Sequence, residues 1–574
     1  GDALTDADYN TAVGYAALST DTLGSRSTAV GYNALKVQNF TTATNSENVA
    51  VGYEAGLDVT TAQYSTFVGA FAGSNVTTGD YNTAIGRHAL LANQTGQYNV
   101  AVGSNVLDSA TGDSNTAVGY VAGGAVTSGV ANTLIGNTAG DALTDADYNV
   151  AIGSTALTSD TLGSRSVAVG YGTLVLQNFT TATDTYNVAV GYGAGANITQ
   201  GQQNTLIGGL AGQVLADTDF NVAVGMSALQ TDTGGQYSTA IGYQTLFSQN
   251  FTTSGTSTNN TAVGRLAGRS ITTGIVNTLV GSAAGDALTD ADYNTVVGYA
   301  ALTNDTLGSR STAIGNSALQ TQNFTTATNA LNTAVGYAAG NAITTGTGNT
   351  CIGGNAGDEM TTGSTNTFVG YVSAGTGVVT GDNNTGIGVE SGKNVTSGSN
   401  NTFLGHAAGI TGSPGGNITT GSNNIVLGDE NVTALFCQDT SISTSDERDK
   451  TDFAALTLGL DFVKALEPVT YYWDRRSRYG DRDAEDYDLN AQKPDGTHKE
   501  DKMHTGFKAQ AVVALEEAAG YKQSDKTNLV SNLTEDGTQY GLKYERFIPI
   551  LVKAMQEQDA IIQSLTARIA ALES

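Results

Sequence analysis

The chain has 574 residues, with 73 Gly, 4 Pro and 2 Cys, and its formal net charge is −28. This acidic balance excludes nucleic-acid binding, which needs basic groups to neutralise phosphates. Two cysteines, Cys351 and Cys437, cannot make a disulfide framework, and no apolar run approaches the roughly 18 residues of a membrane span. A hydrophobic content of 39% excludes a disordered chain, and Gly without a Gly-X-Y register excludes collagen.

One phrase, Asn/Ser-Thr-Ala-Val/Ile-Gly, recurs twenty-four times between Asn10 and Gly428, mostly seventeen residues apart. Repetition at a fixed short period is typical of stacked, quasi-one-dimensional folds. We therefore predict an all-β shaft over residues 1–430, a parallel β-roll or β-solenoid of about 24 rungs spanning roughly 110 Å. Because Gly1 already lies within the pattern, we expect the sequence to be a fragment.

Each repeat has the periodicity of a short strand. Thr11 and Val13 alternate with Asn10 and Ala12. Gly14 ends the strand because glycine tolerates the positive φ of a corner in the chain. A second, less apolar segment and a group of turn-forming residues complete the rung. In-register stacking would align the asparagines of successive phrases, so we predict a structural ladder of buried Asn side chains.

Four rungs are longer and carry the motif Gln-Asn-Phe-Thr-Thr. An insertion into a solenoid rung has to bulge from one face, and such faces often bind ligands. Two interpretations stay open for the four phenyl rings. They form spaced aromatic contacts for a receptor glycan, or each ring packs its own loop against the shaft. The residues are Phe40, Phe179, Phe251 and Phe324.

The shaft also contains repeated Asp-x-Asp-x-Asn segments, which hint at calcium. The Gly and terminal Glu of an EF-hand loop are missing, and alternate residues of a strand share a face in any case. We therefore predict no metal site and no cofactor, with the weak calcium candidates being Asp6, Asp8, Asp145, Asp147, Asp290 and Asp292.

One Thr per rung is poor evidence for ice binding. A glycosidase would need two carboxylates roughly 5–10 Å apart, which the sequence cannot place.

The repeated phrase resembles the head repeats of trimeric autotransporter adhesins and the shaft repeats of phage tail fibres, although the adhesin repeats are shorter. The resemblance implies a parallel homotrimer. A thin roll that buries few apolar residues per rung would also depend on many rungs and on chain association for its stability.

Composition changes at about residue 441, where the repeat stops. Eight Lys or Arg precede this point and seventeen follow it. After a linker (431–444) we predict a small α+β domain (445–546) with a helix over Leu456–Leu466, a strand over Val469–Trp473, a polar loop over Asp474–Lys502 and a helix or strand-helix over Phe507–Ala519. A coiled-coil helix follows over residues 547–574.

The final helix carries apolar residues at heptad spacing. The a positions are Ile548, Met555, Ile562 and Ile569, and the d positions are Leu551, Gln558, Leu565 and Leu572. Ile at a with Leu at d favours two strands. This conflicts with the trimer that the resemblance implies, and we expect the trimeric body to decide the number of chains.

A second resemblance rests on several motifs in the C-terminal region. They are Ser445-Asp-Glu-Arg-Asp-Lys450, the run from Gly459 to Trp473, Gly506-Phe-Lys-Ala-Gln510, Leu542-Lys-Tyr544 and the terminal heptads. Together these closely resemble the intramolecular chaperone auto-processing domain of phage tailspikes, endosialidases and neck appendages, which also occurs in a membrane-bound myelin transcription regulator. One departure is Lys508, where relatives usually carry an apolar residue.

This resemblance implies a trimeric chaperone that assembles the fibre and then cuts itself off through a Ser-Lys dyad. Ser445 matches the nucleophile and Lys450 the base, while Asp446 and Arg448 match supporting positions. A serine hydroxyl becomes a good nucleophile only when a nearby base takes its proton, and a lysine amine can do so only when desolvation favours its neutral form. The carbonyl of Thr444 is the nearer target. Alternatively, Ser445 is a helix N-cap followed by acidic residues.

The sequence thus predicts a homotrimeric virion fibre, with self-cleavage as its one enzymatic activity, that attaches to a glycan or protein receptor on a host surface. It predicts no nucleic-acid partner and no membrane insertion. The alternatives are a bacterial cell-surface adhesin that uses the same module and a fibre-borne glycan depolymerase.

Overall fold

The computed structural model describes residues 1–432, 435, 447–480 and 487–573. The chain divides into two compact units, residues 1–337 and 338–574, and each is described by itself. Thr444, Ser445, Asp446 and Cys437 lie outside the described residues.

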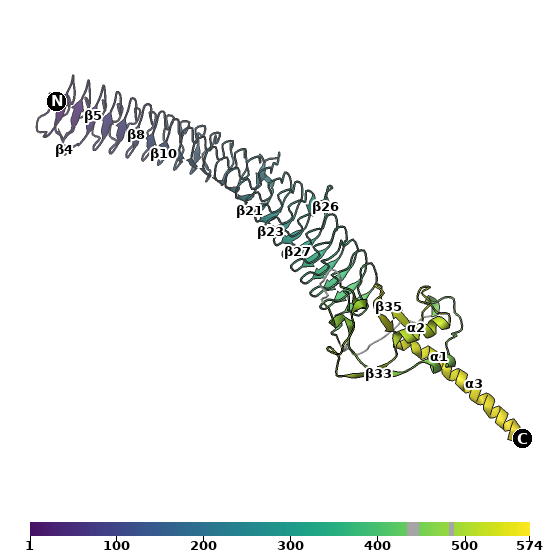
Figure 1. Ribbon diagram of the computed structural model, residues 1–574. Coiled ribbons are helices and arrows are strands. Elements are labelled where there is room, and N and C mark those ends of the chain that lie inside the picture. The colour runs from purple at the N-terminus through teal and green to yellow at the C-terminus, as the bar shows by residue number, and fades with distance from the viewer. Residues whose placement is uncertain (433–434, 436–446, 481–486, 574) are drawn as a thin grey trace. The chain divides into compact units, whose positions relative to one another are not determined.

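The first unit is a β-solenoid, as predicted. Nineteen three-residue strands stack in parallel and in register, so that Thr83, Ala84 and Ile85 of β7 lie beside Val100, Ala101 and Val102 of β8. Figure 1 shows these rungs following one another. The strands are β1 (Thr11–Val13), β3 (Thr28–Val30), β5 (Val49–Val51), β6 (Thr66–Val68), β7 (Thr83–Ile85), β8 (Val100–Val102), β9 (Thr116–Val118), β10 (Thr133–Ile135), β11 (Val150–Ile152), β13 (Val167–Val169), β15 (Val188–Val190), β16 (Thr205–Ile207), β17 (Val222–Val224), β19 (Thr239–Ile241), β21 (Thr261–Val263), β22 (Thr278–Val280), β23 (Thr295–Val297), β25 (Thr312–Ile314) and β27 (Thr333–Val335).

The four long rungs add two-residue parallel strand pairs to this unit. The pairs are β2 (Gly24–Ser25) with β4 (Thr44–Asn45), β12 (Gly163–Ser164) with β14 (Thr183–Asp184), β18 (Gly235–Gln236) with β20 (Thr256–Ser257), and β24 (Gly308–Ser309) with β26 (Thr328–Asn329).

The second unit opens with five more rungs and ends in the C-terminal module. The rung strands are β28 (Thr350–Ile352), β29 (Thr367–Val369), β30 (Thr385–Ile387), β31 (Thr402–Leu404) and β32 (Ile425–Leu427), again parallel. The twenty-four strands of the two units equal the number of phrases in the sequence.

The core of each rung is a narrow column, mostly of small and aliphatic side chains, with a buried Phe at the middle strand position of β6, β29 and β31. The middle residue of the strand points inward, as Ala84 and Ala101 do, and leucines of the following turn, such as Leu90 and Leu107, join it with no exposed surface. The third strand residue points outward, and Ile85 is 40% exposed. The valine of the phrase is therefore a surface residue, and Ala and Leu supply the buried apolar area.

The predicted asparagine ladder is confirmed. Asn82 is fully buried, its Oδ1 accepts the N–H of Asn99 at 3.0 Å, and its Nδ2 donates to the carbonyl of Gly96 at 2.8 Å. Asn99 repeats both bonds with Asn115 and Gly112 at 2.9 and 3.0 Å. Each side chain therefore bonds to the rung on its C-terminal side.

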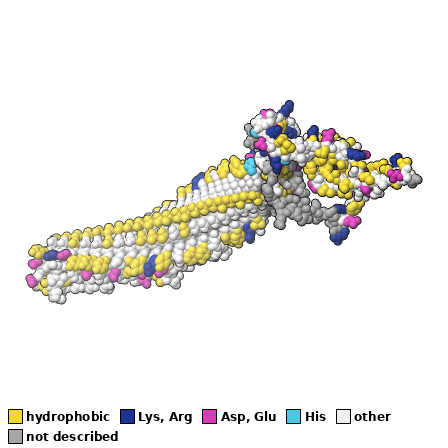
Figure 2. Space-filling view, turned by 90° about the horizontal axis from the view of Figure 1, so that it is seen from below, with side chains coloured by type: hydrophobic (Ala, Val, Ile, Leu, Met, Phe, Trp, Pro, Cys, Tyr) yellow, Lys and Arg dark blue, Asp and Glu magenta, His cyan; other side chains and the backbone are white. Residues whose placement is uncertain are grey.

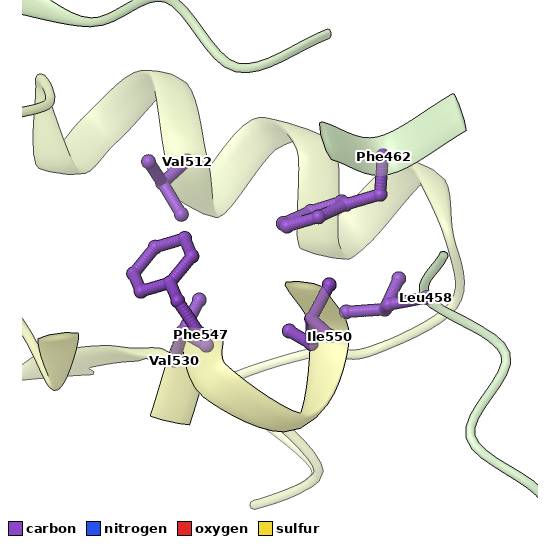
Figure 3. Close-up of a cluster of buried hydrophobic side chains, with 6 residues drawn as sticks. All are labelled: Leu458, Phe462, Val512, Val530, Phe547 and Ile550. Atoms are coloured by element: carbon purple, nitrogen blue, oxygen red, sulfur yellow. The ribbon is translucent and has the colours of Figure 1, made fainter. Parts of the chain in front are cut away.

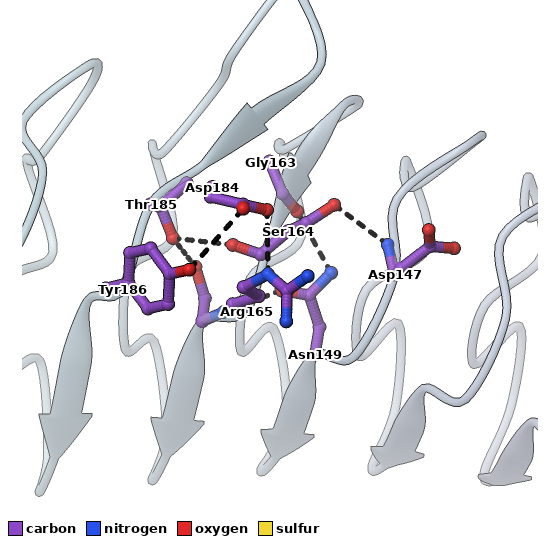
Figure 4. A network of polar contacts seen from close by, with 9 residues as sticks. Asp147, Asn149, Gly163, Ser164, Arg165, Asp184, Thr185 and Tyr186 are labelled. Carbon is purple, nitrogen blue, oxygen red and sulfur yellow. Dashed lines mark hydrogen bonds and ion pairs between the residues drawn. The ribbon is translucent and has the colours of Figure 1, made fainter.

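Other polar contacts between rungs run in both directions. Figure 4 shows Asn149 donating to the carbonyl of Gly163 at 2.9 Å, while the N–H of Asp147 donates to Ser164 Oγ at 3.0 Å. Arg165 pairs with Asp184 at 2.8 Å across the next step. The side chains of Asn149 and Arg165 thus bond to the following rung, whereas those of Ser164 and Asp184 bond to the preceding one.

The outer faces carry rows of apolar side chains. Figure 2 shows these rows as stripes along the stacked rungs. Besides the row of outward Val and Ile residues there are exposed aromatic rows, in which Tyr64, Tyr81 and Tyr98 stack at centroid distances of 4.9 and 5.2 Å. Their ring faces cover one another, so these rows present mainly edges and hydroxyl groups to solvent.

The C-terminal module mixes short helices and hairpins. Its helices are α1 (Leu460–Ala465), α2 (Ala509–Ala518) and α3 (Phe547–Glu573), and its antiparallel pairs are β33 (Val469–Tyr472) with β34 (Met503–Gly506) and β35 (Ser531–Leu533) with β36 (Tyr540–Leu542). Single 3-10 turns are η1 (Glu447–Asp449), η2 (Arg476–Arg478), η3 (Leu489–Ala491) and η4 (Tyr544–Arg546). Within the described ranges, no helix is both long enough and apolar enough to cross a bilayer.

The predicted elements of this module are largely confirmed. The strand at Val469 and the final helix at Phe547 begin where the sequence placed them, and the segment from Phe507 contains a helix. The first helix is shorter than predicted because it begins only after Gly459, a poor residue for a helix interior.

Glycine at the strand end is predicted to be indispensable. Gly103 has φ +136°, and a Cβ there would lie 2.1 Å from the carbonyl oxygen of Gly119 in the next rung. We expect Gly103→Ala to cost about 1–3 kcal/mol through backbone strain alone, with the clash adding to it. Hydrogen exchange across residues 95–125 should accelerate.

Gly209→Ala is the matched control, because a Cβ at Gly209 meets no atom within 4 Å. Equal exchange rates around both substituted sites would contradict the close stacking of rungs.

Candidate functional site

The predicted cleavage site is only partly described. Arg448 lies in η1, and Lys450 follows this turn with its backbone N–H bonded to the carbonyl of Glu447 at 3.1 Å. Both side chains are exposed in the single chain. Since Ser445 and Asp446 lie outside the described residues, the Ser-Lys dyad stays a prediction.

A small apolar core holds the module together. Figure 3 shows Leu458 and Phe462 from the α1 region, Val512 of α2, and Phe547 and Ile550 of α3 converging with Val530. All six side chains are at least nine-tenths buried. The core therefore fixes the two short helices and the segment before β35 against the first turns of α3.

A buried carboxylate clamps this segment to α2. Glu516 is 1% exposed and accepts the N–H groups of Leu529, Val530 and Ser531 at 2.6, 2.7 and 3.0 Å. Sequence reasoning missed this residue. The spacing held a signal, because Glu516 lies four residues after the buried Val512 and therefore on the same helix face.

A second carboxylate ties α1 to α3. Helix α1 has no side-chain cap of its own, and Glu557 Oε2 accepts the N–H of Leu460 at 2.7 Å. This hydrogen bond, with help from Lys553, holds the pKa of Glu557 below its ordinary value. The negative charge also suits the positive end of the helix.

The basic run of the module surrounds one acidic residue. Glu500 lies 3.8 Å from Arg475, 3.6 Å from Arg478 and 3.9 Å from His504, and it is 18% exposed. The guanidinium of Arg475 also covers the ring of Trp473. Sequence reasoning missed Glu500 because only the pairing of β33 with β34 brings it to the arginines. His504 is a polar neighbour in this cluster.

The four phenylalanines of the long rungs are buried, with exposures of 4, 5, 8 and 6% for Phe40, Phe179, Phe251 and Phe324. Each follows a buried Asp–Gln pair. Asp21 accepts Gln38 Nε2 at 2.6 Å and the N–H of Phe40 at 3.2 Å. This burial favours the structural interpretation, because the single chain offers no exposed phenyl ring to a glycan at these positions.

The calcium candidates take part in contacts between rungs. Asp145 and Asp147 accept hydrogen bonds from Ser128 and from the N–H of Val130, and Asp290 and Asp292 bind the preceding rung in the same way. Asp8 donates its N–H to Ser25. Among the residues that the structure describes, which include Asp6, no three acidic, His or Cys side chains gather into a metal-binding group.

Helix α3 has two apolar faces. Phe547, Ile550 and Ala554 are buried within the module. The predicted heptad residues lie elsewhere on the helix and are exposed, with Ile548, Met555 and Leu572 at 61, 69 and 87%. Large apolar side chains at heptad spacing on a helix face that the chain itself leaves uncovered are typical of a coiled-coil seam.

Residues 445–521 match the family described as chaperone of endosialidase. The match includes the predicted dyad and extends through α1, β33, β34 and α2, and it implies self-cleaving peptidase activity in general. No curated protein matches the chain. A chaperone domain of this family at the C-terminus and a long β-solenoid shaft together fit a phage tail fibre.

The Glu516 clamp leads to a prediction about the module's stability. Glu516→Gln keeps one acceptor oxygen but turns an amide N–H₂ towards backbone donors. We expect it to lower the free energy of unfolding of the module by about 1–3 kcal/mol. Urea unfolding followed by the fluorescence of Trp473, the single tryptophan, measures the change.

Glu517→Gln is the control, since Glu517 is the next residue of α2 and is exposed. A similar loss in both variants would show that the clamp contributes nothing specific.

Proposed function

We propose that this chain, whose C-terminal module carries a chaperone-of-endosialidase domain, is a virion fibre whose shaft is assembled by that module and then released from it by self-cleavage. The family match carries the proposal. The β-solenoid of stacked rungs supports the fibre role, because such a fold presents a long, regular surface for attachment.

The fibre is a homotrimer in this proposal. Two features of the single chain support association with further copies. The heptad face of α3 is exposed, and Ile562, Leu565 and Ile569 lie 49–55% open to solvent. The outward Val and Ile row of the shaft, with Val13 as an example, adds a long apolar surface. Burial of both surfaces between identical chains would supply the area that the narrow rung core lacks.

Self-cleavage proceeds through the dyad in this proposal. Ser445 attacks the carbonyl carbon of Thr444, and the amine of Lys450 takes the proton of the serine hydroxyl. The leaving amine, the nitrogen of Ser445 itself, is protonated as the peptide bond breaks, and water then hydrolyses the ester. Lys450 is exposed in the single chain. Since a lysine acts as a base only when it is shielded from water, assembly would arm the site.

The shaft then attaches the virion to a glycan or protein on the host surface. Cleavage leaves residues 1–444, whose repetitive part, residues 1–430, is the acidic shaft. A cell-surface adhesin with the same module differs in what precedes the repeat, where a secretion signal would stand in place of a virion anchor. A depolymerase would shorten host capsule glycans on incubation.

The dyad is tested by expressing the wild-type chain and Ser445→Ala. Denaturing gels of assembled wild type should show a shaft band and a fragment of residues 445–574, whereas Ser445→Ala should stay full length. Native mass spectrometry of the variant should give three times the chain mass.

Ser443→Ala, a change of a neighbouring serine, should cleave like the wild type. Full-length bands from the assembled wild type would refute self-processing, and a single-chain mass would refute the homotrimer independently.

A further inference from the structure

Two interior rungs share a polar arrangement in the turn that follows the buried column. Ser128 Oγ donates to the carboxylate of Asp145 in the next rung at 2.5 Å, and Thr273 Oγ1 donates to Asp290 at 2.7 Å. Three residues earlier in each rung, the N–H of Ala125 and that of Ser270 donate to carbonyls of the next rung at 2.9 and 3.0 Å. Each turn therefore needs one acceptor for a hydroxyl and one for a backbone amide.

The last rung has the same turn, and the described residues contain no rung after it. Its residues Asn417, Thr420 and Gly421 stand where Ala125, Ser128 and Gly129 stand in the earlier rung, at the same relative spacing. Thr420 is exposed and Asn417 half-buried, so water can reach this turn. Its donors nevertheless find acceptors in another part of the chain.

The turn between β35 and β36, residues 534–538, supplies these acceptors. Thr420 Oγ1 donates to Glu535, which stands in the place of the next rung's aspartate. The N–H of Asn417 donates to Asp536 Oδ2 at 3.1 Å, in the place of the next rung's carbonyl. Both contacts span more than a hundred residues of sequence and repeat the bonding of an interior rung.

The glycine of this turn also lies close to an oxygen atom in both places. A Cβ at Gly129 would lie 2.5 Å from the carbonyl oxygen of Ala146 in the next rung. A Cβ at Gly421 would lie 2.2 Å from Glu535 Oε2. The carboxylate oxygen of the hairpin thus occupies the position that a backbone oxygen of a following rung occupies elsewhere.

The hairpin is organised for this contact by its own bonds. Asp536 Oδ1 accepts the N–H of Thr538 at 3.0 Å and the hydroxyls of Thr534 and Thr538 at 2.5 and 2.7 Å, which leaves Oδ2 for Asn417. Burial raises the pKa of Asp536, but these bonds and the one from Asn417 outweigh it, so the pKa lies below its ordinary value. The carboxylate is therefore charged at neutral pH.

Two arginines also contact the β35–β36 turn and the end of the repeat. Arg476 donates to the carbonyl of Thr538 in the hairpin, and Arg475 donates to the carbonyl of Glu430, just after β32. Neighbouring residues of η2 and its N-terminal flank thereby link the hairpin to the end of the repeat.

We propose that the β35–β36 turn is a surrogate rung, which docks on the last rung of the solenoid and provides the acceptors that a following rung would provide. The partner of this surface is the turn of residues 417–421. The contact would give the growing shaft its first ordered edge, a consequence that rests on the proposed chaperone function. Release of the module would then expose the donors of the last rung.

The test uses the full chain with Ser445→Ala, so that the module stays attached whether or not the dyad is active. Glu535→Ala removes the acceptor of Thr420 from an exposed side chain. We expect hydrogen exchange in residues 410–424 to accelerate at least about tenfold, equivalent to about 1.4 kcal/mol. Exchange in residues 350–387 should not change.

Glu535→Gln retains an acceptor oxygen and should restore part of the protection, whereas Glu517→Ala should have no effect. Unchanged exchange in residues 410–424 for Glu535→Ala would overturn the surrogate rung. Failure of the chaperone function would appear separately, as a Ser445→Ala chain that does not assemble although Glu535→Ala still alters exchange.

Discussion

The buried asparagine side chains bond chiefly to the rung on their C-terminal side, and some, such as Asn132, also donate to the asparagine of the preceding rung. Asn82 uses both of its amide atoms on Gly96 and Asn99, and Asn99 does the same with the following rung. A buried amide without partners costs about 1–3 kcal/mol, so a rung cannot close around its asparagine until its successor is ordered. The other polar contacts run in both directions: Ser128 donates forward to Asp145, whereas Thr185 donates back to the carbonyl of Ser164. The asparagine ladder thus has a main direction, and its dependence is passed along the chain to the last rung.

Because of this direction, the stability of the repeat depends on what contacts its last rung. The rung core is a column of Ala and Leu with the valines outside, so each rung buries little apolar area and depends on its neighbours. At the last rung the dependence falls on Glu535 and Asp536, carried by a module with its own core and with Glu516 clamped to the strand before them. The residues that match the chaperone family, 445–521, include Glu516, which holds the strand that leads to this turn.

The sequence predicts the repetitive half of this account well, because repetition makes one local pattern visible twenty-four times. The strand phrase, the asparagine ladder and the final helix at Phe547 follow from spacing and residue type. Which strand residue faces inward does not follow, since Thr, Ala and Val all suit a strand. The inward position holds Ala in most rungs but Leu134 in β10 and Phe67 in β6. The phenyl ring of Phe40 is buried because Asp21 and Gln38 hold its loop, a contact invisible in the motif itself. Glu500 meets Arg475, and Asn417 meets Asp536, only in the folded chain. These partners are far apart in sequence, and no repeat or motif spacing relates them.

We infer from the asparagine ladder that order spreads through the solenoid from its C-terminal end. Pulse-labelling hydrogen exchange during refolding of the full chain measures this directly, because amides in each rung report when that rung becomes protected. We expect peptides covering β30 to β32 to gain protection first and those covering β1 to β5 to gain it last. Protection that appears first in the N-terminal rungs, or in all rungs at once, would contradict it.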